Sequence, residues 1–183
     1  DAGVYCDQNV SFVDELGATT SGPRFTFNVR IADRPDIVKL IRDVAGAMNA
    51  SVIWANGDWK VIQDRPTAST KVITKYNTIR EAGFTRRSSK ADERHTAVNV
   101  AFNDRTDRYL QRVVTVESTE GIGRYGYNPI DIAAYGCTTE AQAIRAGKWL
   151  LDTELNQTQI IEFQMGMNGF DLEPGQVITV FDD

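Results

Sequence analysis

The chain has 183 residues, 42% apolar and 25% charged, which is the composition of an ordinary soluble globular protein able to bury its own core. Its formal net charge of −5 argues against general binding to nucleic acid or anionic membranes, because backbone phosphates favour proteins with excess lysine and arginine. Two cysteines, Cys6 and Cys137, cannot build a disulfide framework or a four-thiolate zinc site, and no apolar run approaches the roughly 20 residues of a membrane span.

The first 24 residues show little periodicity. They end in a cluster of small, turn-forming residues, Gly17–Pro23, which predicts a flexible connection, with an added edge strand as the alternative. The chain opens on Asp1 rather than methionine and ends in residues that still read as a strand. We therefore expect a piece of a longer polypeptide, with both cysteines as free thiols in a reducing cytoplasm.

A strand and a helix are predicted next. Phe25–Ile31 alternates apolar and polar residues, which places every apolar side chain on one face of a strand. Apolar residues then recur at helical spacing from Ile37 to Met48. Asp33 is the expected N-cap of this helix, and Pro35 fits its first turn, where a missing N–H costs nothing.

A hairpin completes this part of the chain. Ser51–Trp54 and Trp59–Gln63 flank Asn56–Gly57, a pair that favours the positive φ angles of a tight type I′ turn. Proline and small polar residues in Asp64–Thr70 then break the pattern. We therefore predict a small strand–helix–hairpin lobe at residues 25–68.

The remaining residues, 69–183, are richer in strand patterns. The two longest runs, Thr96–Phe102 and Tyr109–Glu117, are expected to pair as a hairpin. Shorter strands are predicted at Val72–Thr74, Ile161–Met167 and Val177–Phe181, the last after a Pro174–Gly175 type II turn.

One helix is predicted in this second half. Thr139 and Gln142 have the spacing of a capping box at its start. Its buried face is expected to carry Ala143, Ile144, Gly147, Leu150, Leu151 and Leu155. The sequence thus predicts an α+β, β-rich fold: an N-terminal extended segment at 1–24, the small lobe at 25–68, and an antiparallel, barrel-like lobe at 69–183 that packs one helix.

Two patterns suggest catalysis or cofactor binding, and neither is complete. Gly121–Gly126 matches the G-x-G-x-x-G dinucleotide fingerprint, but the helix that must follow is missing, so a glycine-rich turn between strands is favoured. His95 is the single histidine, and the candidate partners for a catalytic group around it are Ser88, Ser89, Asp92 and Cys137. No nucleophile elbow accompanies them, so we assign no catalytic, cofactor or metal residue.

A basic run is the remaining candidate. It comprises Arg86, Arg87, Lys90 and Arg94, followed by Arg105, Arg108 and Arg112. Interspersed acidic residues favour a salt-bridged surface or protein interface, and contact with DNA is the alternative.

Several segments together resemble the hub region of phage tail-tip attachment proteins, the lambda J (host specificity) family with its prophage relatives. They are Pro23–Asn28, Trp54–Trp59, Asp64–Pro66, Arg94–Val100, Arg124–Gly126, Tyr135–Ala143 and Leu172–Ile178. The resemblance implies a structural, non-enzymatic part of a tail tip or baseplate hub, made in the bacterial host cytoplasm and located at the virion tail tip.

The same resemblance implies partners. A hub of this kind is a homotrimer that joins the tail tube to fibre or tip proteins and lines a DNA exit channel. Transient contact with DNA in that channel is an alternative role for four basic residues, Arg86, Arg87, Lys90 and Arg94. We expect the isolated fragment to be monomeric and not to insert into membranes. Two rival functions are a receptor- or carbohydrate-binding module, suggested by Trp54 and Trp59, and a nucleotide-binding enzyme domain. Aromatic residues at a hairpin more often belong to a core.

Overall fold

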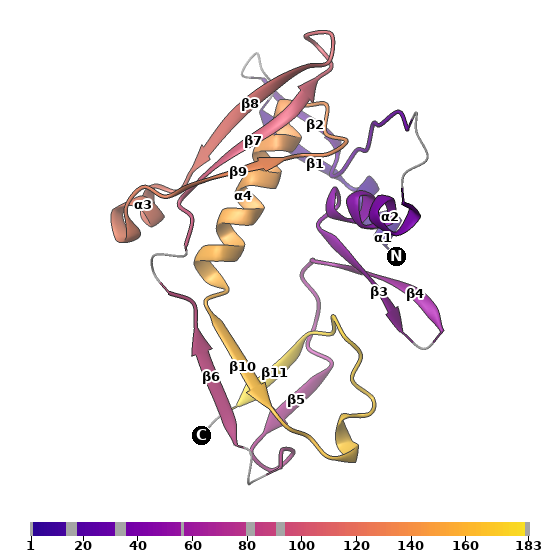
Figure 1. The fold of residues 1–183 in the computed structure, drawn as a ribbon, viewed down its shortest axis with the longest axis vertical. Helices are drawn as coiled ribbons and strands as arrows, with labels where there is room; N and C mark the ends of the chain where they lie inside the picture. The colour runs from indigo at the N-terminus through magenta and orange to yellow at the C-terminus, as the bar shows by residue number, and fades with distance from the viewer. Residues whose placement is uncertain are drawn as a thin grey trace. The chain divides into compact units, whose positions relative to one another are not determined.

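A computed structural model gives the fold, and it describes residues 2–13, 18–31, 36–55, 57–79, 83–90 and 94–181 (Figure 1). The chain groups into two compact units, each made of two separate stretches. Unit 1 comprises Asp1–Gln63 and Ala91–Gln157, and unit 2 comprises Asp64–Lys90 and Thr158–Asp183. The division into domains at residues 24 and 68 stays a prediction.

The core of unit 1 is a three-stranded sheet packed against one long helix. Strand β7 (Ala97–Asp104) is central and pairs antiparallel with β8 (Leu110–Glu117), as the sequence predicts. Its other edge pairs in parallel with β9 (Pro129–Ala133), which the sequence reasoning missed. Helix α4 (Glu140–Asn156) lies across this sheet (Figure 1).

Alternation on β7 and helical spacing on α4 explain why these two elements meet. Residues two apart on a strand share a face, as do residues four apart on a helix. The buried cluster that results consists of Val98, Val100, Phe102, Val116, Cys137, Ala143 and Leu151. Gly147 lies between Ala143 and Leu151, and a Cβ added there would be 2.9 Å from Cγ2 of Val116. Glycine therefore allows the helix to approach the sheet closely.

The first 24 residues are more regular than predicted. They form helix α1 (Ala2–Asp7) and an antiparallel hairpin of β1 (Asn9–Val13) with β2 (Thr19–Pro23). The expectation of a flexible connection is therefore wrong for Thr19–Pro23, because Thr19 and Thr20 pair with Val13 and Phe12.

The strand predicted at Phe25–Ile31 is also wrong. These residues belong to neither strand nor helix. The backbone of Thr26 bonds to a side chain instead of a neighbouring strand: its N–H donates to Oε1 of Gln142, and its carbonyl accepts from Nε2 of the same amide. The amide of Gln142 thus takes the position that a paired strand would occupy.

The helix and hairpin that follow agree with the sequence. Helix α2 spans Ile37–Gly46, and its N-cap is Asp36, whose carboxylate accepts from the N–H of Val38 at 2.8 Å. The predicted cap at Asp33, and Pro35, lie outside the described residues. Strands β3 (Ala50–Ala55) and β4 (Asp58–Gln63) form the hairpin.

The turn of this hairpin is described only in part. Asn56 is outside the described residues, and Gly57 has φ +87°, the left-handed conformation for which glycine was predicted.

Two predictions about the second half of unit 1 need correction. Gly121–Gly126 is not a turn between strands: residues 121–125 lie in helix α3 (Thr119–Tyr125), which is capped by the hydroxyl of Ser118 and ends at Gly126. The capping box on α4 is not formed either. Thr139 makes no side-chain cap bond, and the side-chain amide of Gln142 bonds to Thr26 instead of reaching back to the start of the helix.

The described residues of unit 2 form four strands in two separate pairs. Strand β10 (Gln159–Phe163) pairs antiparallel with β6 (Phe84–Ser88), and β11 (Ile178–Phe181) pairs in parallel with β5 (Lys71–Thr74). The predicted strand at Ile161–Met167 ends earlier, at Phe163, and Met167–Gly169 is a 3-10 helix. Gly175 has φ +87°, as a type II turn requires.

The fold class is α+β and β-rich. All sheets formed by the described strands are open and contain two or three strands, so the barrel-like lobe predicted for residues 69–183 is not observed. Within the described ranges, each helix is too short or too polar to span a membrane.

Candidate functional site

His95 is held by a carboxylate rather than by a nucleophile. Its Nδ1 lies 2.8 Å from Oε2 of Glu154 near the end of α4, and its backbone N–H donates to the same oxygen at 2.8 Å. Asp92, the partner suggested by the sequence, is outside the described residues. Ser88 and Ser89 belong to unit 2, and Ser88 donates its hydroxyl hydrogen to the carbonyl of Thr158. These contacts connect the residues just before β7 to helix α4, so the role of His95 in this geometry is structural.

Cys137 is a core residue. Its side chain is 3% exposed, and Sγ donates to the carbonyl of Thr139 at 3.2 Å. Burial raises the pKa of the Cys137 thiol, which keeps it protonated at neutral pH. A protonated thiol is a poor nucleophile, so the site lacks the feature that cysteine catalysis needs.

The glycine motif also has a packing role. A Cβ at Gly121 would lie 3.2 Å from Cδ1 of Leu155, so glycine allows α3 to lie against α4. A dinucleotide fingerprint needs a long helix that begins inside the motif, whereas α3 spans only Thr119–Tyr125. Among the described residues, no group of three or more histidine, cysteine, aspartate or glutamate side chains could hold a metal ion.

The basic residues are divided between the two units. Arg86, Arg87 and Lys90 belong to unit 2, whereas Arg94, Arg105, Arg108 and Arg112 belong to unit 1. Arg87 forms an ion pair of 3.4 Å with Glu162 on the neighbouring strand β10. Arg94 donates to the hydroxyl of Tyr125 at 2.5 Å and stacks on its ring at 4.9 Å.

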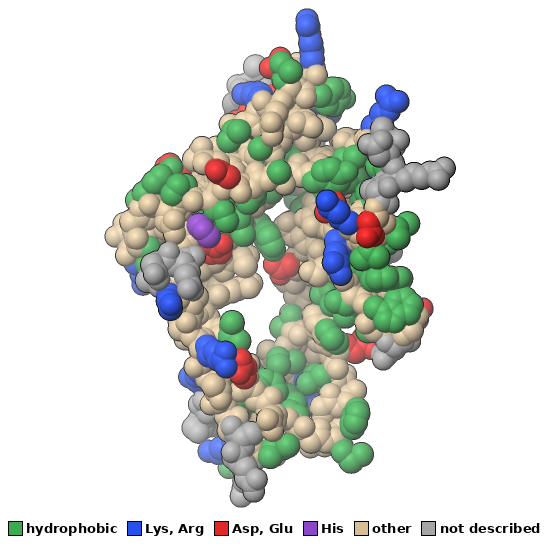
Figure 2. All heavy atoms as spheres, in the orientation of Figure 1, with side chains coloured by type: hydrophobic (Ala, Val, Ile, Leu, Met, Phe, Trp, Pro, Cys, Tyr) green, Lys and Arg blue, Asp and Glu red, His purple; other side chains and the backbone are tan. Residues whose placement is uncertain are grey.

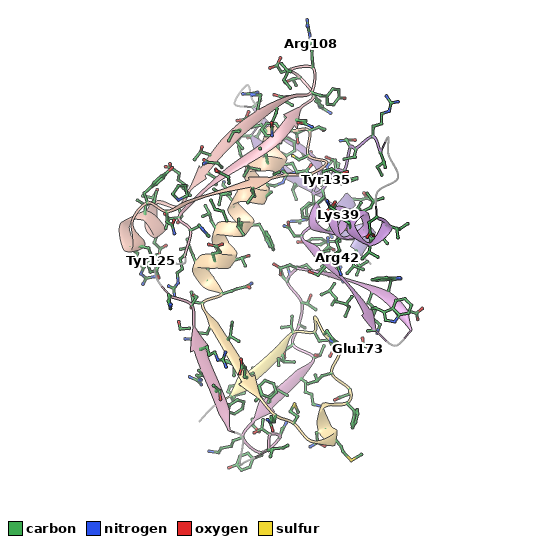
Figure 3. All side chains as sticks on the ribbon, in the orientation of Figure 1. Lys39, Arg42, Arg108, Tyr125, Tyr135 and Glu173 are labelled. Atoms are coloured by element: carbon green, nitrogen blue, oxygen red, sulfur yellow. The ribbon has the colours of Figure 1, made fainter. Side chains whose placement is uncertain are left out.

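One ion pair of this group, between Arg112 and Asp104, is buried at its acidic end. Arg112 donates to Asp104 at 2.6 Å, and the Asp104 side chain is fully buried. The hydroxyl of Thr106, and then the guanidinium of Arg112, lower the pKa of Asp104 from 3.8 to about 2. The salt-bridged character predicted for this run is therefore observed at Arg87 and Arg112. Arg108 lies at the outer end of the β7–β8 hairpin and points away from the unit (Figure 3).

The β3–β4 hairpin carries an exposed apolar surface. Two cross-strand pairs, Val52–Val61 and Trp54–Trp59, lie on the same side of it, and we name these four residues the tryptophan face. Trp54 is 60% exposed and Trp59 is 51% exposed. The two rings meet edge to face with centroids 5.2 Å apart. The expectation that aromatic residues at this hairpin belong to a core is thus wrong, and Figure 2 shows the hydrophobic side chains gathered over β3–β4.

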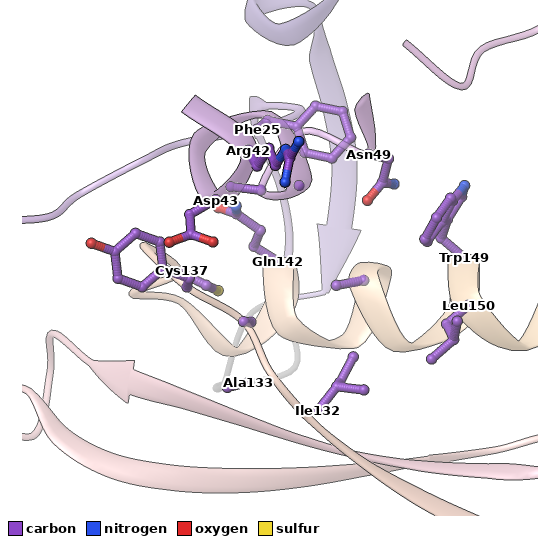
Figure 4. Close-up of a pocket in the computed structure, with 15 residues that line it drawn as sticks. Phe25, Arg42, Asp43, Asn49, Ile132, Ala133, Cys137, Gln142, Trp149 and Leu150 are labelled. Carbon is purple, nitrogen blue, oxygen red and sulfur yellow. The ribbon is translucent and has the colours of Figure 1, made fainter. Parts of the chain in front are cut away.

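A pocket of about 390 Å³ lies between α2 and α4 in the same unit. Apolar side chains such as Ile132, Trp149 and Leu150 line much of its wall, and Arg42 and Asp43 lie at α2 (Figure 4). Cys137 also faces this pocket, but its thiol is protonated for the reason given above. The walls suit an apolar side chain or small apolar group better than a charged substrate.

Comparisons with known proteins agree with a structural role. Residues 36–183 match the family described as "Putative phage tail protein". Over all 183 residues the chain is 35% identical to a protein named Tip attachment protein J of Escherichia phage SECphi27. Over 178 residues it is 28% identical to the protein of the same name in Escherichia phage SECphi4.

The family match covers most of the chain, including α2, the three-stranded sheet, α4 and both strand pairs of unit 2. The chain therefore belongs to this family of phage tail proteins. It spans only 15% of the length of each of the two relatives.

Proposed function

We propose that this chain is a structural component of a bacteriophage tail tip, the hub of the baseplate, and that it acts by assembling with other tail proteins rather than by catalysis. The similarity to two tip attachment proteins, over all of the chain for one and 97% of it for the other, is the observation that carries the proposal. The chemistry of the described residues supports it, since the histidine is tied to Glu154 and Cys137 is a buried thiol.

The surface of unit 1 supports an assembly role. The tryptophan face exposes two large aromatic residues next to each other, and tryptophan is strongly enriched among the residues that dominate protein–protein binding energy. A hub built from three copies of this chain, in contact with tube, fibre or tip proteins, would cover such a face. The proposed location is accordingly the tail tip of the virion, after synthesis in the bacterial cytoplasm.

Carbohydrate or receptor binding is a second candidate, because exposed tryptophan rings also stack on sugars. The ring geometry favours protein contact, since an interplanar angle of 72° leaves no flat platform shared by Trp54 and Trp59. A glycan array separates the two functions. Specific glycan binding that is lost in Trp54→Ala would support the receptor-binding module instead.

Location in the particle is the direct test. An epitope inserted into the exposed loop at Asp107–Arg108, between β7 and β8, leaves the core untouched. Gold-labelled antibody is expected at the end of the tail distal to the capsid. The same insertion at Gly57 in the β3–β4 turn is the matched variant and is expected to label poorly if the tryptophan face is covered. Label along the tail tube or on the capsid, or particles free of the chain, would refute the proposed location.

A further inference from the structure

The stretch Phe27–Ile31, named here the open segment, has the sequence of a strand but no strand partner. Its apolar residues Phe27, Val29 and Ile31 alternate with polar ones, and β-branched and aromatic residues are those that favour strands. Such a sequence normally pairs within its own fold. Here it lies in neither strand nor helix, so local preference and local structure disagree.

The backbone hydrogen bonds of the open segment are mostly unmade. Among its five residues, only the N–H of Asn28 has a backbone partner in the described structure, the carbonyl of Gly136 at 2.9 Å. In a β ladder, neighbouring residues direct their N–H and C=O groups to opposite sides. Because the N–H of Asn28 bonds to Gly136, the backbone N–H and C=O groups of Phe27, Val29 and Ile31 would face away from Gly136. They would then have the spacing that an incoming strand requires.

One end of the open segment is firmly anchored. The Phe27 ring meets Tyr135 edge to face at 5.6 Å and covers Gly136, where an added Cβ would lie only 2.4 Å from the ring. The side chain of Asn28 donates to Thr138 at 3.1 Å. The segment is thus held in place before any partner arrives, which lowers the entropic cost of binding.

A wide groove of about 1080 Å³ runs beside the open segment in the same unit. Residues 27–30 line it, together with Ala101, Asn103 and Gln111 on β7 and β8 and the stretch 133–138 that contains Gly136. Arg30 is the one charged side chain among the described residues that line it. An extended segment with an acidic residue near Arg30 would match both the shape and the charge of this groove.

We propose that the open segment is a strand-addition site, which pairs through Phe27, Val29 and Ile31 with an extended, acidic segment of another tail protein. Addition of a strand satisfies backbone groups on both chains, while alternate side chains of the added strand enter the groove. The inference rests on the proposed function, because it names the kind of partner that a tail-tip component takes at this position.

Hydrogen exchange on the whole protein, free and in purified tails, tests the site. The Val29 and Ile31 amides are expected to exchange quickly in the free protein and at least about tenfold more slowly in tails. If the Val29 and Ile31 amides exchange as fast in tails as in the free protein, strand addition is refuted and the proposed function is not. Tails that lack the protein would overturn the proposed function and, with it, this proposal.

A matched pair of variants separates the backbone from the side chain. Val29→Pro removes an N–H that has no partner in this structure, so the loss of this donor should leave the melting temperature unchanged. It should lower the fraction of protein found in tails at least about fivefold, whereas Val29→Thr, which keeps the N–H and the branched side chain, should stay within about twofold. Equal incorporation of both variants would overturn the proposal.

A photo-crosslinker at Ile31 identifies the occupant. An adduct with a different tail protein supports the proposal, and mapping should place the attachment in an acidic, extended segment. An adduct joining two copies of this chain would instead make the open segment a self-pairing edge and would overturn the choice of partner.

Discussion

Replacement of Gly147 by alanine tests the closest approach of helix α4 to the sheet. The new Cβ would lie 2.9 Å from Cγ2 of Val116 and 3.1 Å from Cγ2 of Val100. Two carbon atoms in favourable contact are about 3.5 to 4.0 Å apart, so both valines would have to move. Each is β-branched, stiff and buried, which makes the movement costly.

The expected change in stability is the difference between two effects. Overpacking a core costs about 1 to 3 kcal/mol, while alanine gains about 1 kcal/mol over glycine in a helix interior. We expect Gly147→Ala to lower the free energy of unfolding by about 1 kcal/mol, which corresponds to a fall of about 2 to 4 °C in melting temperature for a chain of this size.

Urea denaturation with a matched control measures the effect. Gly123 lies inside helix α3, is exposed, and has no atom within 4 Å of an added Cβ. Gly123→Ala should therefore raise the free energy of unfolding, by up to about 1 kcal/mol. A lower free energy of unfolding for Gly147→Ala together with a higher one for Gly123→Ala supports the reasoning. If Gly147→Ala is as stable as the original chain while Gly123→Ala is stabilised, the close approach of α4 to the sheet is refuted.

Three further predictions concern ionisable and thiol groups. The pKa of Asp104 is lowered from 3.8 to about 2, so its ionised form stabilises the fold above pH 3.8, and this contribution is lost as the pH falls to about 2. Asp104→Asn should thus lower the melting temperature at pH 7, with the difference shrinking below pH 3.8 in calorimetry, and a constant difference would contradict this. Glu154→Gln, which weakens the tie to His95, should cost about 1 to 2 kcal/mol in urea denaturation, whereas Glu162→Gln, at an exposed pair, should cost less than about 0.5 kcal/mol. Iodoacetamide should label Cys6 well before Cys137 in the folded chain, because Cys137 is buried with its pKa raised, and equal labelling rates would contradict this.

The sequence predicted the elements whose pattern is local. The β7–β8 hairpin, helix α2 and the β3–β4 hairpin all follow from alternation, helical spacing or a turn pair, and they were placed within a few residues of their observed bounds. Strand β9 was missed because Pro129–Ala133 is short and gains its stability from pairing with β7, some 30 residues earlier in the chain.

Two of the errors have a common cause, which is a tertiary contact that outweighs a local preference. Phe25–Ile31 has the sequence pattern of a strand, but the side-chain amide of Gln142, far along the chain, takes the backbone hydrogen bonds of Thr26. The same contact removes Gln142 from the capping box that its spacing from Thr139 predicts. The exposure of Trp54 and Trp59 could not be predicted either, because the hairpin pattern does not say which side is covered.

The contact between Thr26 and Gln142 has a consequence for synthesis. It joins residues 116 positions apart, so the hairpin β1–β2 and the residues after it leave the ribosome well before their partner helix exists. At about 5 to 20 residues per second, the delay is roughly 6 to 23 s. Closing so long a loop is also entropically costly, which makes docking of the amino-terminal hairpin a late event in folding. Until then, the apolar side chains of that hairpin are available to chaperones.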